Sequence, residues 1–371
     1  MLLKQARQRP FLALIITVIA VGLCFFLAFK PTTTQSPEVT KPILHPDLVR
    51  SSFWLSNLHL GASGRVYGAR KKSLHRIEED GTITTRLYQF HHQIQAIHEH
   101  SDELLLVATD RDYWDPDTPS RLYKSVDGGK SFELIKAILG GSFVWWSLAT
   151  DSQGTIFAAE YGPQGKAWSK TLWRSNDNGV SWDISFKASE RDKIHLHRIA
   201  VDPYTDDIWL TVGDGLNRQM LSSQDHGDTW EKVAPLQATS VAFSKAAIYW
   251  GKDEKGEPGV TRFDRETRAF APYFDPREYG DFGGSIYDMT RLPSGDFVIP
   301  FMKYPNDEHK VSVWFGSENQ WQLLLEQDHS SYGLSSVAGP DTDGWVYLSG
   351  YQFRAFHHAP SLPFIPLLLL D

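Results

Sequence analysis

The 371-residue sequence predicts an all-β protein, with a seven-bladed β-propeller as the first expectation and a six-bladed propeller with an accessory sheet as the alternative. From about residue 50 onward, short runs of β-branched and aromatic residues alternate with Gly, Asp and Asn turns. Almost none of these runs has the 3.6-residue period of a helix. Aromatic residues make up 13% of the chain, which suits pleated surfaces on which flat rings pack.

Regular β-type segments recur at intervals of about 50 residues, the length of one four-stranded blade. They are residues 64–70, 103–109, 155–161, 207–213, 247–253, 296–302 and 345–351. The last repeat shows only three evident strands, ending at FRAFHH. We expect its missing strand to come either from PFIPLLLL near the C-terminus or from LVRSSFW, which begins at Leu48.

Three turns are near copies with the pattern S-x-D-x-G-x-x-W/F. We expect the Ser and Asp side chains to accept backbone N–H groups, the Gly to adopt a positive φ and the ring to pack down into the sheet. The residues are Ser125, Asp127, Gly129, Phe132, Ser175, Asp177, Gly179, Trp182, Ser223, Asp225, Gly227 and Trp230. Because the three aspartates are 50 and 48 residues apart, the turns mark successive repeats and have a structural role.

The turn pattern resembles the Asp-box, or BNR repeat, of the sialidase-like β-propellers, and the resemblance covers residues 50–360 as architecture. HLHRIAVDPYTDDIWLTVGD, which begins at His195, is similar to a segment of bacterial BNR-repeat proteins described as glycosyl-hydrolase-like. Sialidases also carry an Arg-Ile-Pro motif and a three-arginine clamp. The motif is absent from this sequence, and the candidate rim arginines reduce to Arg111, Arg354 and, less surely, Arg198.

The resemblance also implies that the loops before the first strand and after the second strand of every blade gather at one end of a central channel. That rim is rich in His, Trp, Tyr and carboxylates, whereas the opposite end holds ordinary turns. The candidate catalytic residues are His195, His197, Glu160, Tyr161, Asp214 and Tyr351. The candidate substrate-binding residues are Arg111, Asp110, Trp145, Trp146, Lys303 and Arg354.

Each rim residue has a functional and a structural interpretation. A histidine of the pair His195 and His197 can act as a general acid or base that Glu160 or Asp214 orients. The same histidines can instead fill space between blades. Adjacent tryptophans such as Trp145 and Trp146 can stack on sugar rings or pack in the core. No cofactor is predicted, and a divalent metal at His195 and His197 with a carboxylate is the minority alternative.

The N-terminal region predicts a membrane anchor. Residues 1–10 are a basic flank, and Phe11–Phe29 is an uninterrupted apolar run of 19 residues, long enough at roughly 28 Å to cross a bilayer. The basic flank places the N-terminus in the cytoplasm and the body in the periplasm or outside the cell. A cleaved signal peptide is the competing interpretation, but no small-x-small site follows the run. Cys24 has Leu23 before it, which disfavours a lipoprotein.

Composition describes the rest of the chain and disfavours one class of partner. Residues 30–46 are rich in Pro and Thr and predict a linker, and residues 47–371 form the propeller. The formal net charge is -8, and the basic N-terminus leaves about -12 on the remainder, which disfavours nucleic acid as a partner. Cys24 is the only cysteine, so the predicted propeller has neither disulfides nor thiol chemistry.

These observations predict a single-pass membrane protein whose extracytoplasmic propeller binds or processes carbohydrate at the channel mouth. A glycoside hydrolase-like or a polysaccharide lyase-like reaction suits the rim residues, and whether the protein is an enzyme stays open. The alternative is a non-catalytic docking scaffold or assembly factor that binds a membrane or envelope protein. An enzyme requires the rim residues to converge on one point, whereas a scaffold would scatter them.

Overall fold

The computed structural model describes residues 43–44, 48–78, 81, 83–101, 103–110, 118–139, 141–164, 167–168, 170–188, 195–254, 256–303, 310–318, 320–328, 336–349 and 351–354. The chain divides into two compact units, Met1–Lys41 and Pro42–Asp371, and the fold below is that of the second. The apolar run Phe11–Phe29 and the PFIPLLLL segment lie outside the described residues. Among the residues that are described, no helix has the length and apolar character needed to cross a membrane.

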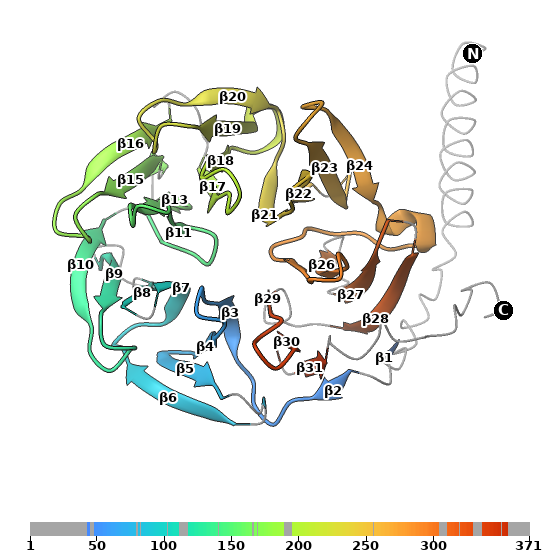
Figure 1. Cartoon of the computed structure of the whole chain (residues 1–371), viewed down its shortest axis with the longest axis horizontal. Helices are drawn as coiled ribbons and strands as arrows, with labels where there is room; N and C mark the ends of the chain where they lie inside the picture. Colours follow the sequence, from blue (N-terminus) through green and yellow to red (C-terminus); the bar gives the residue numbers. More distant parts are fainter. Residues whose placement is uncertain are drawn as a thin grey trace, which may run out of the picture. The chain divides into compact units, whose positions relative to one another are not determined.

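The second unit is an all-β propeller, because antiparallel sheets stand around a common centre (Figure 1). Six blades, rather than the expected seven, each contain four strands that follow one another in the sequence. Their strands are β3 (Ser56–Leu60), β4 (Val66–Arg70), β5 (Ser73–Ile77) and β6 (Thr84–Gln89); β7 (Ile94–Ser101), β8 (Leu104–Thr109), β9 (Ser120–Ser125) and β10 (Glu133–Ile138); β11 (Leu148–Thr150), β12 (Ile156–Ala159), β15 (Thr171–Ser175) and β16 (Asp183–Lys187); β17 (Leu196–Val201), β18 (Ile208–Val212), β19 (Gln219–Ser223) and β20 (Glu231–Ala234); β21 (Ala238–Phe243), β22 (Ala247–Lys252), β23 (Val260–Asp264) and β24 (Phe270–Phe274); and β25 (Thr290–Arg291), β26 (Phe297–Lys303), β27 (Lys310–Ser317) and β28 (Gln320–Asp328).

A composite sheet completes the ring. It joins β29 (Val337–Ala338), β30 (Trp345–Leu348) and β31 (Tyr351–Arg354) to β2 (Val49–Arg50) from the start of the unit. Val49 pairs with Gln352, so LVRSSFW supplies the closing strand, as one of the two sequence alternatives predicted. In Figure 1 the blue β2 accordingly lies beside the red β31. The innermost strands contact one another in the closed order β3, β7, β11, β17, β21, β25–β26 and β29.

A few short elements lie outside this plan. β1 (Ile43–Leu44) pairs with the outer edge of β28, so two residues of the predicted linker 30–46 belong to the folded unit. The open edge of β28 explains the difference, because an unpaired edge accepts an extended segment. A small hairpin of β13 (Pro163–Gln164) and β14 (Ala167–Trp168) and two 3-10 turns, η1 (Gly215–Asn217) and η2 (Pro276–Tyr279), complete the elements.

The core consists of apolar clusters between neighbouring sheets. Leu106 of β8 and Ile156 of β12, for example, belong to one cluster and are fully buried. The seven segments that the sequence singled out contain β4, β8, β12, β18, β22, β26 and β30, the second strand of every sheet. These strands are almost entirely buried because both of their faces contact other sheets, which explains why they read as continuous apolar runs.

The three repeated turns have the predicted hydrogen bonds. Ser175 Oγ accepts the N–H of Gly179 at 2.8 Å, and Asp177 Oδ1 accepts the N–H of Ser181 at 2.8 Å. The other two turns repeat these bonds. The ring also contacts the preceding sheet, since Trp182 Nε1 donates both to the carbonyl oxygen of Gly179 in its own turn and to that of Ile135 in β10. The turns therefore join adjacent blades.

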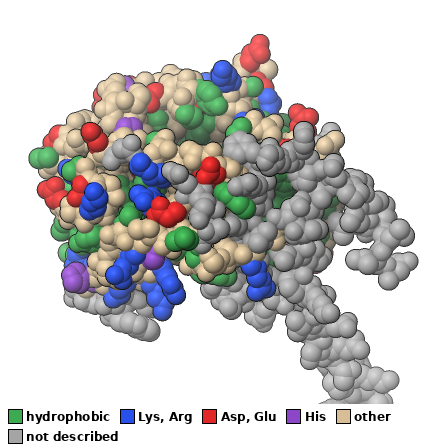
Figure 2. Space-filling model, turned by 60° about the horizontal axis from the view of Figure 1, so that its bottom comes forward, with side chains coloured by type: hydrophobic (Ala, Val, Ile, Leu, Met, Phe, Trp, Pro, Cys, Tyr) green, Lys and Arg blue, Asp and Glu red, His purple; other side chains and the backbone are tan. Residues whose placement is uncertain are grey.

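Several innermost strands are irregular near their first residues. The register shifts between Ser56 and His59 in β3, between Ile94 and Ala96 in β7, and between Leu196 and Ile199 in β17. Such bulges redirect side chains at the point where a strand begins. Figure 2 shows one face of the molecule, on which acidic and basic side chains both occur among hydrophobic ones.

Candidate functional site

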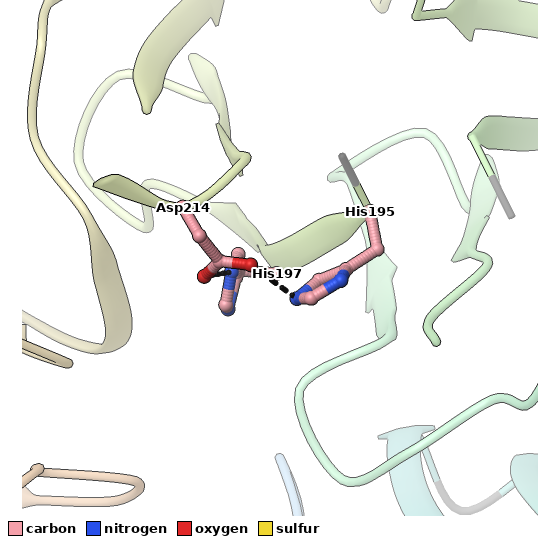
Figure 3. A group of neighbouring side chains, drawn as sticks. All are labelled: His195, His197 and Asp214. Carbon is pink, nitrogen blue, oxygen red and sulfur yellow. Dashed lines mark hydrogen bonds and ion pairs between the residues drawn. The ribbon is translucent and has the colours of Figure 1, made fainter. Parts of the chain in front are cut away.

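Residues from neighbouring sheets meet at the end of the ring where the first strands begin. His195 and His197 lie at the start of β17, and Asp214 directly follows β18 (Figure 3). The N–H of Gly213 donates to the carbonyl oxygen of His195 at 2.9 Å, which holds the end of β18 beside the start of β17. The structure therefore brings together three of the candidate catalytic residues in the way that the alternating pattern of a strand suggested.

Asp214 lies beside both histidines, as the hydrogen-bond partner of His197 and within ion-pair distance of His195. Its Oδ1 lies 3.1 Å from His197 Nε2, and its Oδ2 lies 3.4 Å from His195 Nε2. Gln237, which precedes β21 in the next sheet, donates from Nε2 to Asp214 Oδ1 at 2.8 Å, and its Oε1 accepts the N–H of Gly215 at 3.1 Å. The carboxylate is thus held from two sheets at once.

Burial divides this group into a hidden and an accessible part. His197 is 1% exposed and His195 7%, whereas 46% of the Asp214 side chain is exposed. Burial lowers the pKa of His195 to about 4, so its imidazole is neutral near pH 7. Burial acts to raise the pKa of Asp214, but the hydrogen bond from His197 and the nearby imidazoles hold it below its ordinary value. At neutral pH the site therefore offers an ionised carboxylate supported by a neutral His195.

Aromatic rings form the wall beside the histidines. The Tyr161 ring lies 4.5 Å from that of His195 and 5.1 Å from that of Trp146, measured between centroids. Tyr161 is half-buried. Its backbone pairs with Ser142, whose hydroxyl donates to Asp110 Oδ1 at 2.9 Å. Asp110 thus helps to position the Tyr161 segment.

The two adjacent tryptophans, Trp145 and Trp146, pack against neighbouring aromatic residues. Trp146 is 3% exposed and lies among Tyr161, His197 and Tyr287, so it presents no face on which a sugar could stack. Trp145 is half-buried, and its Nε1 donates to the carbonyl oxygen of Tyr287 at 3.3 Å. This bond joins two sheets across the centre of the ring, which accounts for the packing.

Glu160 does not lie with the histidines. Its carboxylate accepts a hydrogen bond from Trp173 Nε1 at 2.7 Å, and Lys136 Nζ lies 3.5 Å from the centroid of the Trp173 ring. Burial raises the pKa of Glu160, although Trp173 and Lys136 counteract this. Because Glu160 and Tyr161 are adjacent in an extended segment, their side chains point apart. Glu160 therefore makes no contact with the histidines among the described residues, and the carboxylate beside them is that of Asp214.

The side chains of the remaining candidates lie outside what the structure describes. Arg111 lies outside the described residues, and for Lys303, Tyr351 and Arg354 the structure describes only the backbone, within β26 and β31. Gln237 is the residue that the sequence analysis missed. It occupies a position before the first strand of its sheet, so the rule that selected His195 would also have selected it.

The donor set at this site could hold a divalent metal. One ligand atom each from His195, His197 and Asp214 lies within 4.8 Å of the others, and two imidazoles with a carboxylate suit transition metals. Ligating histidines almost always donate their second ring N–H to an acceptor. His197 Nδ1 has no hydrogen-bond partner among the described residues, so the support for a metal is incomplete.

A second group of possible ligands lies among the turns that link successive strands. Asp151 Oδ2 accepts from His226 Nδ1 at 3.0 Å, and the carboxylate of Asp206 accepts both from the N–H and from the hydroxyl of Ser152. Asp151 Oδ1 also accepts the N–H of Thr155 at 2.8 Å. These contacts stabilise turns, and we assign the group no further role.

Comparison with known proteins supports the fold and leaves the activity open. No family model matches the chain, and no curated protein matches it. Among solved structures, the GH74 xyloglucanase of Xanthomonas campestris is 14% identical with a TM-score of 0.61, over 82% of this chain and 52% of that one. The GH74 enzyme of Niastella koreensis is 15% identical with a TM-score of 0.56, over 75% and 47%.

The match to a third structure extends over nearly the whole of both chains. YCF48 bound to D1 peptide is 10% identical with a TM-score of 0.54, over 86% of this chain and 96% of that one. The present chain spans about half the length of the two GH74 enzymes. At these identities the likeness defines the class of the protein as a β-propeller and nothing narrower.

Proposed function

We propose that this propeller binds carbohydrate at the channel mouth, with Asp214, Gln237 and Tyr161 as contact residues and His195 and His197 as their support. The observation that carries the proposal is the arrangement of Asp214. Its carboxylate is half-exposed, yet hydrogen bonds to His197 and Gln237 fix its position. A positioned carboxylate and amide next to an aromatic ring provide the acceptors, donors and apolar surface that a polyhydroxylated ring requires.

Binding is better supported than hydrolysis by a carboxylate pair. Glycosidases commonly use two carboxyl groups about 5–10 Å apart on either side of the scissile bond. Glu160, the second acid of the predicted set, is engaged by Trp173 instead of facing Asp214. A lyase-like elimination does not require the second carboxyl group of such a pair, and it is the reaction to assay once a ligand is known.

The test is glycan-array binding of the full-length chain with Asp214→Asn and with the matched control Asp183→Asn. Asp183 is an exposed aspartate on the outermost strand β16. The proposal predicts binding of at least one glycan by the wild type and the control, and a loss of about tenfold or more in Asp214→Asn. Equal binding by all three proteins would place the glycan elsewhere and overturn this site.

A protein-docking role is the second candidate function. It is favoured by the match to YCF48 bound to D1 peptide, which covers almost all of both chains. Under this alternative the disc would bind a protein segment and no glycan. Absence of glycan binding, together with a defined protein partner that still binds Asp214→Asn, would favour docking over the carbohydrate proposal.

We also propose that Phe11–Phe29 anchors the protein in a membrane with the propeller outside the cytoplasm, and that the three repeated turns make it a BNR-type propeller. The apolar length and the basic flank support the anchor. Carbonate extraction of membranes tests it, because an anchored chain stays in the pellet and a cleaved one is released. Protease accessibility in spheroplasts reports the side on which the propeller lies.

A further inference from the structure

A cavity of about 150 Å³ lies at the centre of the ring, apart from the His195 site. A single buried water needs only about 10–15 Å³ of such volume, so the cavity can hold a small molecule. The residues that line it come from the first strands of several sheets and from the segments beside them, and they include Asn57, His59, Ile97, Trp145, Arg198 and Asp288.

Arg198 reaches the cavity because of the bulge in β17. The register of β17 against β18 shifts between Leu196 and Ile199, so Arg198 lies within the irregular segment. Its backbone N–H donates to Thr211 Oγ1 at 3.0 Å, and that hydroxyl donates in turn to the carbonyl oxygen of Ala238 at 2.6 Å. These two hydrogen bonds hold the bulge at Arg198, which is typical of a bulge that positions a side chain.

One nitrogen of the Arg198 guanidinium, Nε, is buried without an acceptor among the described residues. Burial lowers the pKa of Arg198, with the charge of Asp288 acting in the opposite direction. A buried guanidinium nitrogen without an acceptor is unfavourable, so an oxyanion that accepts from it in the cavity would be favoured.

His59 also lines the cavity. Its Nε2 accepts the backbone N–H of Glu99 at 2.9 Å, and burial lowers the pKa of its imidazole to about 4. A neutral imidazole that accepts at Nε2 carries its proton on Nδ1. His59 therefore adds a neutral imidazole to the lining of the cavity.

Asp288 interacts with Arg198 through its charge, but no hydrogen bond joins the two side chains among the described residues. Its Oδ1 accepts the N–H of Met289 at 3.0 Å, and its Oδ2 accepts the N–H of Val337 at 3.2 Å. Apolar side chains, including Ile97 and Met289, form other parts of the wall. The cavity thus combines a forked cation and a neutral imidazole with a lining whose accessible surface is mainly polar, a combination that matches a small carboxylate.

We infer that the central cavity is a binding site for a small organic carboxylate, held by the guanidinium of Arg198 and assisted by His59. The site is separate from the channel-mouth site and does not depend on the proposed carbohydrate function. Trp145 lines the cavity, and its bond to Tyr287 joins two sheets next to it.

The test is isothermal titration of the full-length chain with propionate, with the neutral isostere propionamide and with inorganic phosphate. The variants are Arg198→Gln and the control Arg86→Gln, an exposed arginine on β6. We expect saturable 1:1 binding of propionate at least tenfold tighter than that of propionamide or phosphate. We expect the same binding in Arg86→Gln and a loss of tenfold or more in Arg198→Gln.

Any of three results would overturn the inference: no saturable binding of propionate, equal affinity for propionamide, or unchanged affinity in Arg198→Gln. Tighter binding of phosphate would overturn the carboxylate assignment. If Arg198→Gln does not fold, Arg198→Lys decides the matter, because a lysine keeps the charge but not the fork. It should weaken propionate several-fold while still rejecting propionamide, and unchanged propionate affinity would contradict the assigned role of Arg198.

Discussion

Asp214 shows how a few neighbours define one functional group. His197 and Gln237 both donate to its Oδ1, and the second oxygen faces His195. The sequence identified the histidines because a His-x-His pair at the start of a strand places both rings on one side. The sequence could not decide whether Glu160 or Asp214 is their partner. That choice depends on the direction in which each acidic side chain points from the end of its strand.

Removing His197 should raise the pKa of Asp214. The hydrogen bond and the charge of His197 are the principal effects that lower this pKa against the opposing effect of burial. We therefore predict an upward shift in His197→Ala, measurable by carbon-13 NMR titration of the carboxyl group. The control His75→Ala, on β5, has no bond to Asp214 and should leave the titration unchanged. An unchanged Asp214 pKa in His197→Ala would contradict the described hydrogen bond.

The buried titratable groups predict opposing effects of pH on stability. The pKa of His195 falls from 6.5 to about 4 on folding, so the stability that its neutral form provides is present above pH 6.5 and is lost as the pH falls toward 4. Burial raises the pKa of Asp288 from 3.8 to about 6, with Arg198 opposing this. Asp288 therefore contributes stability below pH 3.8 that is lost as the pH rises through 6.

Asp288→Asn should remove the second effect. The melting temperature of the variant minus that of the wild type should be more positive at pH 7.5 than at pH 4, because only the wild type must ionise a buried acid at pH 7.5. One pKa unit corresponds to about 1.4 kcal/mol, so the difference is measurable by calorimetry. A difference that is independent of pH would mean that Asp288 has an ordinary pKa.

At the scale of elements, the sequence predicted the backbone conformation and the internal hydrogen bonds of the repeated turns. Gly227 has a φ of 84°, and its N–H donates to Ser223 Oγ, as the pattern predicts. What the sequence could not show is that the turn touches the neighbouring blade, where Trp230 Nε1 donates to the carbonyl oxygen of Ser185. Such contacts depend on the order of sheets in space and leave no local signal.

Gly227→Ala should therefore destabilise the fold more than Gly128→Ala. A Cβ at Gly227 would lie 2.5 Å from Ser185 Oγ and 2.9 Å from the Phe157 ring, whereas a Cβ at Gly128 would meet open space. Both glycines have a positive φ, so the backbone strain is matched and the difference reports packing. We expect ~1–3 kcal/mol between the variants in urea denaturation. Equal stability would show that the turn does not contact the next blade closely.

At the scale of the whole molecule, ring closure depends on residues far apart in the chain. The repeat of about 50 residues predicted the propeller, because each repeat needs its neighbours to bury its apolar faces. The number of blades was harder to predict, because the last sheet includes β2, which comes from the start of the unit. The sequence offered two segments for the closing strand, PFIPLLLL and LVRSSFW, and could not decide between them.

Truncation tests this closure. Removal of residues 1–41 should leave the melting temperature of the propeller nearly unchanged, because the second unit starts at Pro42. Removal of residues 1–52 should lower it by roughly 5–10 °C, because β31 loses its partner and the 3%-exposed Leu48 leaves the core. Equal melting temperatures for the two truncations would show that β2 does not stabilise the ring.

The central claim is that a positioned carboxylate at the channel mouth binds a sugar, and tryptophan and tyrosine fluorescence during titration with the best array glycan tests it most directly. Tyr161 lies within the proposed contact surface and beside Trp146, so ligand binding should change the emission of the full-length chain. We predict a saturable change in the wild type and in Asp183→Asn, and a change shifted to at least tenfold higher glycan concentration in Asp214→Asn. Superimposable curves for wild type and Asp214→Asn would contradict the claim.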